Sequence, residues 1–395
     1  MRAINQIVAV TWLNILNLPK RVASSIVSIV GVLAVVLVFA AVLSMAKGFE
    51  RTMVAAGSDH TAIVLRSGAT AELNSGFSYE QTQIIANAPG VAKDGDRPLA
   101  SAELYVVVDM KKKSNGVDAN VPLRGVQPAA LDVRDNVRLV EGRMFETGKN
   151  EMVVGRAASE EFQGLRLGDT VHLARVDWTV VGIFDAGGSV SESEIWIDDR
   201  VLQDVYRRGN SYQSVRVKLD TPDSLETLEK ALADDPRVDV DVLSEKEYYS
   251  TQAEPLSKFI RTLGYPITIL MAIGAVFGAL NSMYSSVSAR GKEIATLRAL
   301  GFGPSAVLLS TIVESTLLAL VGGIIGGAIA YVVFNGLRVS TLNGGNFSQV
   351  VFNFAVTPDL ILQGLVAALI IGLVGGFLPA VRAARLPVAQ ALREL

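Results

Sequence analysis

The sequence predicts an α-helical membrane protein with four transmembrane helices and a large α+β extracytoplasmic domain between helices 1 and 2. Half of the 395 residues are hydrophobic, only 19% are charged, and the mean hydropathy is +0.37. This balance is too apolar for an ordinary soluble protein. Four long stretches are almost free of charge and long enough to cross a bilayer. The polar residues gather in one segment of roughly 200 residues, which is large enough to bury its own core.

The N-terminal residues 1–21 predict an amphipathic helix lying along the cytoplasmic face of the membrane. Its apolar side is formed by Ile4, Ile7, Val8, Trp12, Leu13 and Leu16, and Pro19 ends it. Residues 22–47 form the first predicted transmembrane helix, and residues 22–46 carry no charge. A cleaved signal peptide is the alternative, but this apolar run is longer than a typical signal and begins well inside the chain.

Residues 48–257 predict a soluble domain because apolar and polar residues alternate there without a spanning run. Its predicted strands are Ala62–Leu65, Leu104–Val108, Met152–Val154, Thr170–Leu173, Trp178–Phe184, Ile195–Ile197, Ser214–Leu219 and Val238–Leu243. Its predicted helices are Tyr79–Asn87 and Ser224–Ala233. The strand–helix–strand order at the end of the domain indicates a small α+β subdomain, with a more strand-rich subdomain before it.

The remaining transmembrane helices are predicted from the spacing of charges. They comprise residues 258–289, 305–337 and 359–381, which leaves a cytoplasmic connector at 290–304, an outside loop at 338–358 and a cytoplasmic tail at 382–395. The basic residues gather in three pieces of the chain: Arg2, Lys20 and Arg21; Arg290, Lys292 and Arg298; Arg382, Arg385 and Arg393. The positive-inside rule places all three pieces in the cytoplasm and the large domain outside.

The chain lacks the residues that several classes of protein function require. The chain has no cysteine, its two histidines, His60 and His172, are far apart in sequence, and no GxxxxGK[ST] sequence occurs. The neighbouring acids Asp198 and Asp199 are interpreted as a solvated turn rather than a metal site. We therefore expect no catalytic residue, no metal site, no cofactor bound by this chain and no nucleic-acid partner.

Glycines spaced four residues apart lie in the last three transmembrane helices, at Gly274 and Gly278, Gly322 and Gly326, Gly323 and Gly327, and Gly372 and Gly376. The residues assigned to packing or dimerisation are Gly322, Gly326, Gly372 and Gly376. This spacing lets helix backbones approach closely in lipid, either within one subunit or in a dimer. Glu314 is the one charged residue of the third span. A carboxylate at that depth is a functional candidate by default, but the favoured interpretation is that Glu314 either lies near the cytoplasmic interface or pairs with a neighbouring helix.

The cytoplasmic connector predicts a short docking helix for a soluble partner. Ile294 and Leu297 share one face at helical spacing, and the sequence from Gly301 to Pro304 stops the helix abruptly. An ordinary charged loop would not need the apolar stripe. The residues assigned to this docking site are Arg290, Lys292, Glu293, Ile294, Leu297 and Arg298.

Three segments carry a resemblance to a known family. The connector RGKEIATLRALGFGPSAV, the tail LPAVRAARLPVAQALREL and the outside stretch NEMVVGRAASEEFQGLRLGDTVHL followed by WTVVGIF resemble MacB/FtsX-type, or type VII, ABC transporter permeases, a group that includes LolC and LolE. The layout of one span, a large outside domain and three further spans agrees with that family. The resemblance covers nearly the whole chain.

The resemblance implies a non-catalytic permease subunit in the bacterial inner membrane, with its large domain in the periplasm. It implies a second permease copy, identical or related, and a separate ABC ATPase subunit that binds ATP and Mg²⁺. ATP hydrolysis would move the periplasmic domain, by mechanotransmission, to export or extract a substrate from the periplasm or outer leaflet. The resemblance does not decide whether a periplasmic adaptor and an outer-membrane channel take part, or which cargo is moved. The alternative is an FtsX-like signalling scaffold that activates a periplasmic cell-wall hydrolase.

Overall fold

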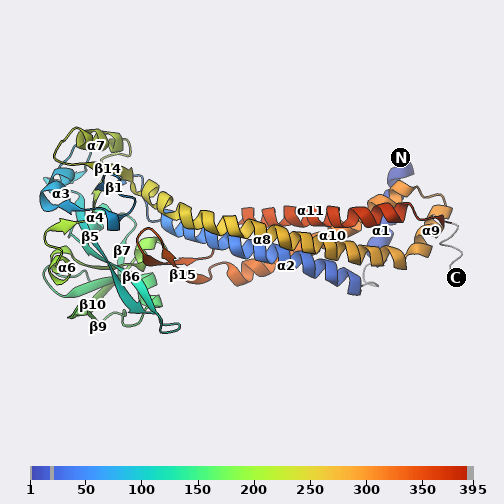
Figure 1. Ribbon diagram of the computed structural model, residues 1–395, viewed down its shortest axis with the longest axis horizontal. Helices are drawn as coiled ribbons and strands as arrows, with labels where there is room; N and C mark the ends of the chain where they lie inside the picture. The colour runs from blue at the N-terminus through green and yellow to red at the C-terminus, as the bar shows by residue number, and fades with distance from the viewer. Residues whose placement is uncertain (1, 18–21, 389–395) are drawn as a thin grey trace. The chain divides into compact units, whose positions relative to one another are not determined.

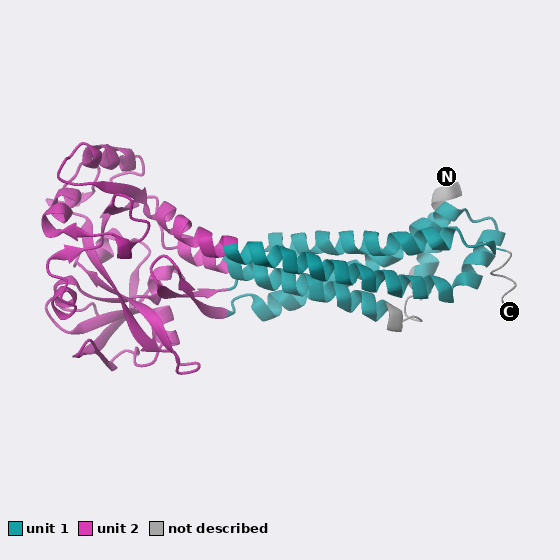
Figure 2. Cartoon of the chain, viewed as in Figure 1, with its two compact units in different colours: residues 1–47, 259–337, 354–395 teal, residues 48–258, 338–353 magenta. Residues whose placement is uncertain are grey.

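The computed structural model describes residues 2–17 and 22–388, which fall into two compact units (Figure 2). Unit 1 comprises Met1–Lys47, Phe259–Leu337 and Phe354–Leu395, and unit 2 comprises Gly48–Lys258 and Arg338–Asn353. The predicted helix break at Pro19, the flanking Lys20 and Arg21, and Arg393 of the tail lie outside the described residues.

Unit 1 is helical because its long apolar runs can satisfy their backbone groups in lipid only by forming helices. Its elements are α1 (Arg2–Asn17), α2 (Val22–Val54), α8 (Glu245–Ala289), α9 (Gly291–Ala299), α10 (Pro304–Phe334) and α11 (Pro358–Ala384). Four of these, α2, α8, α10 and α11, are long and apolar enough to cross a membrane. Two of them, α2 and α8, extend as unbroken helices past the predicted spans and into the residues of unit 2.

The interior of the helical bundle is formed by all four of these helices, which run side by side in Figure 1. The buried residues are β-branched on α2 and mostly small on the other helices: Val32, Val35, Val36, Ala275, Ala319, Ala368 and Ile371. Small side chains allow close approach where the hydrophobic effect does not drive association. The apolar side chains on the outside of the bundle remain exposed, as in a lipid-facing surface.

The predicted glycine pairs of α10 and α11 lie against neighbouring helices of the same chain. A Cβ added at Gly322 would stand 2.5 Å from the Ile29 carbonyl oxygen, and one at Gly326 would stand 2.7 Å from that of Leu33. Both glycines therefore pack α10 against α2. On α11, added Cβ atoms would stand 2.7 Å from Ala319 Cβ at Gly372 and 2.6 Å from Ser315 Cβ at Gly376. These two glycines pack α11 against α10.

Unit 2 is built on a ten-stranded mixed sheet with the order β14-β1-β13-β5-β6-β11-β8-β10-β7, and β9 pairs with β10. The strands are β1 (Thr61–Arg66), β5 (Ala100–Lys111), β6 (Asp118–Val126), β7 (Arg138–Gly142), β8 (Glu151–Gly155), β9 (Thr170–Leu173), β10 (Val176–Asp185), β11 (Ile195–Asp198), β13 (Ser214–Lys218) and β14 (Val240–Ser244). Each strand predicted from alternation overlaps one of these, because alternation reports which face of a strand is buried.

Shorter elements complete unit 2. The helices are α3 (Tyr79–Ala86), α4 (Ala130–Val133), α5 (Arg156–Glu161), α6 (Asp199–Val205) and α7 (Ser224–Ala233), with 3₁₀ turns η2 (Glu72–Asn74) and η3 (Val190–Ser193). Small strand pairs are β2 (Phe77–Ser78) with β12 (Ser211–Tyr212), β3 (Lys93–Asp94) with β4 (Arg97–Pro98), and β15 (Arg338–Asn343) with β16 (Ser348–Asn353). The helices α3 and α7 coincide with the two predicted ones to within one residue.

Two lobes share the long strand β5. The first lobe packs α3 and α7 on β14, β1 and β13, and Ala100 and Ala102 of β5 belong to its core. The second lobe is strand-rich, and Leu104, Val106 and Val108 of the same strand belong to its core. The expected α+β subdomain at the end of the domain is found only in part, because the first lobe also takes β1, α3 and the start of β5 from the beginning of the domain. The second lobe is the more strand-rich part.

The predicted outside loop at 338–358 holds more structure than expected. Its residues 338–353 form the antiparallel hairpin β15–β16 and belong to unit 2. Tyr105 Oη lies 2.8 Å from Ser348 Oγ, and Lys112 Nζ donates to Ser340 Oγ at 2.6 Å. The backbone N–H of Val351 donates to Ser193 Oγ at 3.0 Å. The hairpin is therefore tied to the second lobe by specific polar contacts.

A buried ion network joins the strands of the two lobes. Arg124 of β6 contacts Glu72 at 2.6 Å, Glu103 at 2.9 Å and Glu194 at 2.7 Å. Arg216 of β13 contacts Glu103 at 3.0 Å. Burial opposes ionisation of Glu72, but the Arg124 and Arg216 guanidiniums outweigh it and hold the pKa of this carboxyl below its usual range. Each arginine in the network is thus stabilised by carboxylates from other strands and turns.

Candidate coupling site

The connector folds as the short helix α9, set off from the helices before and after it. Arg290 has φ −103° and ψ 7°, which ends α8 and starts α9 one residue later. Gly301 has φ +93°, a conformation that glycine adopts without steric cost. Pro304 then begins α10 at a position where its missing N–H removes no helical hydrogen bond. These three residues set the ends of α9 and separate it from α8 and α10.

Arg290 lies inside the bundle rather than on its surface. Its Nη1 atom donates to Glu314 Oε2 on α10 at 2.6 Å, and the two side chains are 5% and 3% exposed. Its Nη2 atom donates to Asn14 Oδ1 on α1. Arg290 Nε also stands 3.8 Å from a carboxylate oxygen of Glu293. Glu314 is therefore paired with a residue outside its own helix, and this residue is Arg290, the first residue of the connector.

Ile294 does not form an exposed docking stripe, and this part of the expectation is wrong. The side chain is 6% exposed and packs with Val287 of α8, Val307 of α10 and Ala383 of α11. Apolar side chains at helical spacing signal a buried face, and here the face is buried by the chain's own helices. Leu297 is half-buried beside it.

The outer face of α9 is polar and mixed in charge. Lys292, Glu293, Thr296, Ala299 and Leu300 are exposed, and Leu300 retains 72% of its accessible surface. Of the predicted docking residues, only Lys292 and Glu293 are exposed on this face. A partner that approaches α9 would meet these side chains first.

Arg298 fastens the end of α9 to the end of α11. Its Nη1 atom donates to the carbonyl oxygens of Ala384 at 2.8 Å and Leu386 at 3.1 Å. The last carbonyls of a helix have no intrahelical partner and carry partial negative charge, so a guanidinium stabilises them. Arg298 is therefore a capping residue for α11 as well as part of the connector.

The N-terminal helix contacts both ends of the connector through residues that the sequence did not single out. Asn14 accepts from Arg290 before α9. Gln6 donates to the Gly301 carbonyl and accepts from the Gly303 N–H after α9, both at 3.4 Å. Asn14 and Gln6 are eight residues apart, so they fall on one side of α1. Two amides at this spacing are common in amphipathic helices, which is why they gave no distinctive signal.

Comparison with known proteins identifies the family to which this chain belongs. A model of the MacB-like periplasmic core domain matches residues 25–235, more than half of the chain. A model of the FtsX-like permease C-terminal region matches residues 266–388, which include α9. The chain belongs to the MacB/FtsX family of ABC transporter permeases. The permease is thus a membrane protein with four candidate spans and an extracytoplasmic domain, unit 2, and the predicted fold class and family are confirmed.

Three curated relatives show how much of the permease is shared. It is 23% identical over 393 residues to an uncharacterized ABC transporter permease of Methanocaldococcus jannaschii, covering 95% of this chain and 96% of that one. It is 25% identical over 398 residues to the ABC transporter permease YtrF of Bacillus subtilis, covering 81% and 90%. It is 27% identical over 297 residues to the macrolide export ATP-binding/permease protein MacB of Bdellovibrio bacteriovorus, covering 69% of this chain but 44% of that protein.

Proposed function

We propose that the permease couples ATP hydrolysis by a separate ATPase subunit to a conformational change of unit 2, and so drives export or extraction of a substrate. The observation that supports this most is the fastening of α9. Arg290, Ile294 and Arg298 tie it to α1, α10 and α11, and its outer face stays exposed. A force applied to α9 would be transmitted to the three helices that it contacts.

The membrane topology supports a cytoplasmic partner at α9. Unit 2 is extracytoplasmic, and α8 leads from unit 2 through a candidate span to Arg290. One crossing brings the chain to the other side of the membrane, where the proposed soluble ATPase would bind. The basic residues of the connector agree with this side.

The length of α8 supports outward transmission of that motion. It contains 45 residues, or about 68 Å at the rise of an α-helix, whereas the hydrocarbon core is only about 30 Å thick. About half of the helix therefore extends beyond the bilayer without a break. A stiff helix transmits a rigid-body movement, and helix shifts of this kind are a recognised form of conformational switching.

ATP and Mg²⁺ are assigned to the partner in this proposal. The sequence has no GxxxxGK[ST] phosphate-binding loop. The MacB relative is named as an ATP-binding/permease protein, and the permease spans 44% of it. The name of the MacB relative combines ATP binding and a permease in one chain. In this proposal, an ATPase on a second polypeptide supplies the ATP binding.

A second permease copy, identical or related, is part of the same proposal. Gly274 and Gly278 on α8 have no atom within 4 Å of an added Cβ, and Leu270 and Phe277 beside them are 69% and 65% exposed. This face suits another transmembrane helix or lipid. Residence in a bacterial inner membrane, an adaptor protein and an outer-membrane channel remain proposals drawn from the family.

The test is charge reversal on the exposed face of α9 in a complex of the permease with its ATPase. Glu293→Lys should lower permease-dependent ATPase stimulation several-fold and weaken co-purification, and Glu293→Gln, which removes the same contact with Arg290 without reversing the charge, should lower both to a smaller extent. Glu226→Lys is the matched control, because Glu226 is an exposed residue on α7 in unit 2. Full stimulation and retention of the ATPase by the Glu293→Lys variant would count against coupling through α9.

A further inference from the structure

The buried ion network of unit 2 contains unequal numbers of acidic and basic groups. Its cations are Arg124, Arg134 and Arg216, and its carboxyl groups are those of Glu72, Glu103, Glu194 and Glu245. Each of these side chains is 5% exposed or less. The network lies where the lobes meet, because Glu103 stands between Ala102 of the first core and Leu104 of the second.

Four ionised carboxylates on three guanidiniums would leave one negative charge in excess. A buried charge without a counter-charge is strongly unfavourable. A buried ionisable group therefore changes its protonation rather than stay uncompensated. Guanidiniums do not release a proton in proteins. The charges of the network balance when one of its carboxyl groups carries a proton.

Two of the carboxyl groups are held in the ionised form. Glu103 contacts all three arginines, at 2.7 Å to 3.0 Å. Glu72 accepts from both Nη atoms of Arg124, at 2.6 Å and 3.0 Å. Burial opposes ionisation of both residues, but the arginines outweigh it and lower the pKa of each below its usual range. The proton therefore belongs to Glu194 or Glu245.

Glu194 has more donors than Glu245. Glu194 accepts from Arg124 Nε at 2.8 Å, from Arg124 Nη2 at 2.7 Å and from Trp196 Nε1 at 2.7 Å. Among the described residues, Glu245 has a single ion-pair partner, Arg216. That guanidinium also contacts the two carboxylates that are already ionised. Glu245 is thus the carboxyl group that gains least from being charged.

The surroundings of Glu245 supply no second close cation among the described residues. The charged groups of other elements that act on it are Arg216, Arg134, Arg124 and Glu103. On its own helix, Lys246 and Glu247 are exposed, and Lys246 pairs with Asp59 at 2.9 Å. The amino end of α8 begins at Glu245 and carries about half a positive charge. Half a charge does not balance an excess of one.

The position of Glu245 at the start of α8 links its charge to the attachment of this helix. Arg216 also donates to Tyr249 Oη at 3.1 Å, one turn further along. Tyr248 and Tyr249 are both buried. An ionised Glu245 would be repelled by the Glu103 carboxylate, with which it shares Arg216. The first turn of α8 is therefore held most firmly when Glu245 is neutral.

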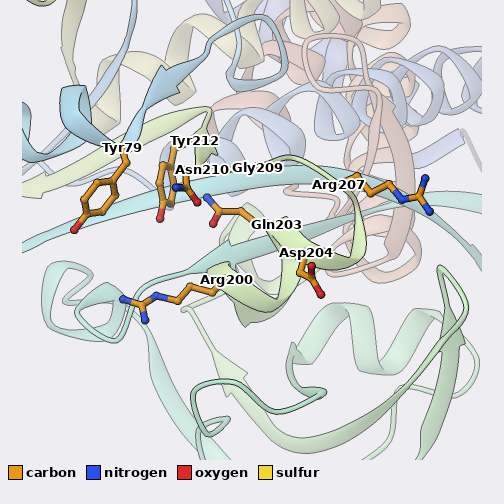
Figure 3. Close-up of a pocket in the computed structure, with 8 residues that line it drawn as sticks. All are labelled: Tyr79, Arg200, Gln203, Asp204, Arg207, Gly209, Asn210 and Tyr212. Carbon is orange, nitrogen blue, oxygen red and sulfur yellow. The ribbon is translucent and has the colours of Figure 1, made fainter.

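The lobes are not packed against each other along their whole boundary. Figure 3 shows a hollow of about 520 Å³ there, lined by Tyr79 and Tyr212 of the first lobe and by Gln203 and Asp204 of α6 in the second. Tyr212 Oη donates to Asp199 at 2.9 Å across this boundary. The contacts between the lobes are discontinuous, and the network is one of the places that fasten them.

We propose that Glu245 carries a proton at neutral pH and that this proton latches the first turn of α8 to the junction of the two lobes. The neutral carboxyl group leaves Arg216 as a counter-charge for Glu72 and Glu103. Loss of the proton as the pH rises restores the excess negative charge and loosens the turn. The latch is thus closed by a proton and opened by base.

The proton is tested by infrared spectroscopy of the full-length permease at pH 7 in dodecyl maltoside, a detergent without a carbonyl group. A protonated carboxyl group gives a C=O stretching band above those of carboxylates and amides. We expect this band in the spectrum of the unaltered permease minus that of Glu245→Gln. Glu247→Gln is the matched control, because Glu247 is exposed two residues further along α8, and its difference spectrum should lack the band.

The latch is tested by hydrogen exchange of residues 245–252, measured by mass spectrometry between pH 7 and pH 9 and corrected for the intrinsic exchange rate. Exchange should become several-fold faster in the unaltered permease as the infrared band disappears. It should stay constant in Glu245→Gln, because glutamine reproduces the neutral form of Glu245. The same reasoning predicts an unchanged thermal unfolding midpoint for this variant at pH 7.

Three results would overturn the proposal. Absence of the band at pH 7 would show that Glu245 is ionised and stabilised by the amino end of α8. A band that persists at pH 9, or that disappears without faster exchange, would remove the latch. Failure of Glu245→Gln to fold would contradict a neutral Glu245. No ATPase is present in these measurements, so their outcome is independent of the proposed coupling function.

Discussion

Arg290 and Glu314 form an ion pair inside the helical bundle, with 2.6 Å between Nη1 and Oε2 and with both side chains almost fully buried. The pair joins the residue that begins the connector to the first half of α10. Asn14 of α1 accepts a second hydrogen bond from the same guanidinium. The position of the connector relative to the bundle therefore depends on a charge that can be removed by mutation.

Removing one member of this pair should destabilise the bundle strongly. Glu314→Gln leaves the buried Arg290 guanidinium with only the exposed carboxylate of Glu293, 3.8 Å from Nε, as a counter-charge. Removing one partner of a buried ion pair typically costs about 3–5 kcal/mol. The thermal unfolding midpoint of the permease in detergent measures this loss. The double variant Arg290→Met, Glu314→Leu should recover most of the stability, because it removes both buried charges. A double variant no more stable than Glu314→Gln would show that the pair is not the source of the effect.

Substitution of the packing glycine Gly326 should separate α10 from α2. A Cβ added there would stand 2.7 Å from the Leu33 carbonyl oxygen, so Gly326→Ala should lower the unfolding midpoint by several degrees. Gly274→Ala is the control, because nothing lies within 4 Å of a Cβ at that position. Alanine also favours the helix by about 1 kcal/mol over glycine. Equal midpoints for the two variants would contradict the packing role of Gly326.

Arg298→Met should loosen the connector without removing its exposed face. The variant loses the hydrogen bonds to the carbonyls of Ala384 and Leu386, so α9 keeps only the apolar contact of Ile294 with Ala383 at the end of α11. Hydrogen exchange measured by mass spectrometry should become faster in residues 291–299 and 384–388. Lys292→Met, which removes an exposed cation from the same helix, should leave the exchange of both segments unchanged.

The stability of unit 2 should fall in acid. The pKa values of Glu72 and Glu103 are lowered in the folded state, since their arginine partners outweigh the opposing effect of burial. A carboxyl group with a lowered folded-state pKa contributes stability above its unfolded pKa of about 4.3, and this stability is lost as the pH falls further toward the folded-state value. Urea unfolding of the full-length permease, followed by tryptophan fluorescence between pH 7 and pH 3, measures this dependence.

Variants separate this network from other acidic groups. Glu72→Gln should unfold at lower urea concentration at pH 7, because Arg124 and Arg216 lose a charged partner, and its loss of stability in acid should be smaller. Glu80→Gln on α3, where Glu80 is exposed, should follow the unaltered permease across the whole range. An acid response of Glu72→Gln as steep as that of the unaltered permease would contradict the role of the network.

The sequence by itself determined the elements whose signals are local. Long charge-free runs specify the spans because backbone hydrogen bonding in lipid admits only helices there. Alternation specified strands such as Thr170–Leu173, which is found unchanged as β9. Gly301 and Pro304 fixed the end of the connector helix because their backbone preferences act within a few residues.

Tertiary structure alone decided what those elements contact. An apolar stripe tells that a face is buried but not by what, so Ile294 was assigned to a partner although Val287, Val307 and Ala383 of the chain cover it. The spacing of a glycine pair does not tell which helix will pack against it. Only the tertiary structure shows that Gly322 and Gly326 pack against α2. The buried contact between Arg216 and Glu72 joins segments more than a hundred residues apart. Contacts between such distant residues depend on the packing of the whole chain, which no local pattern records.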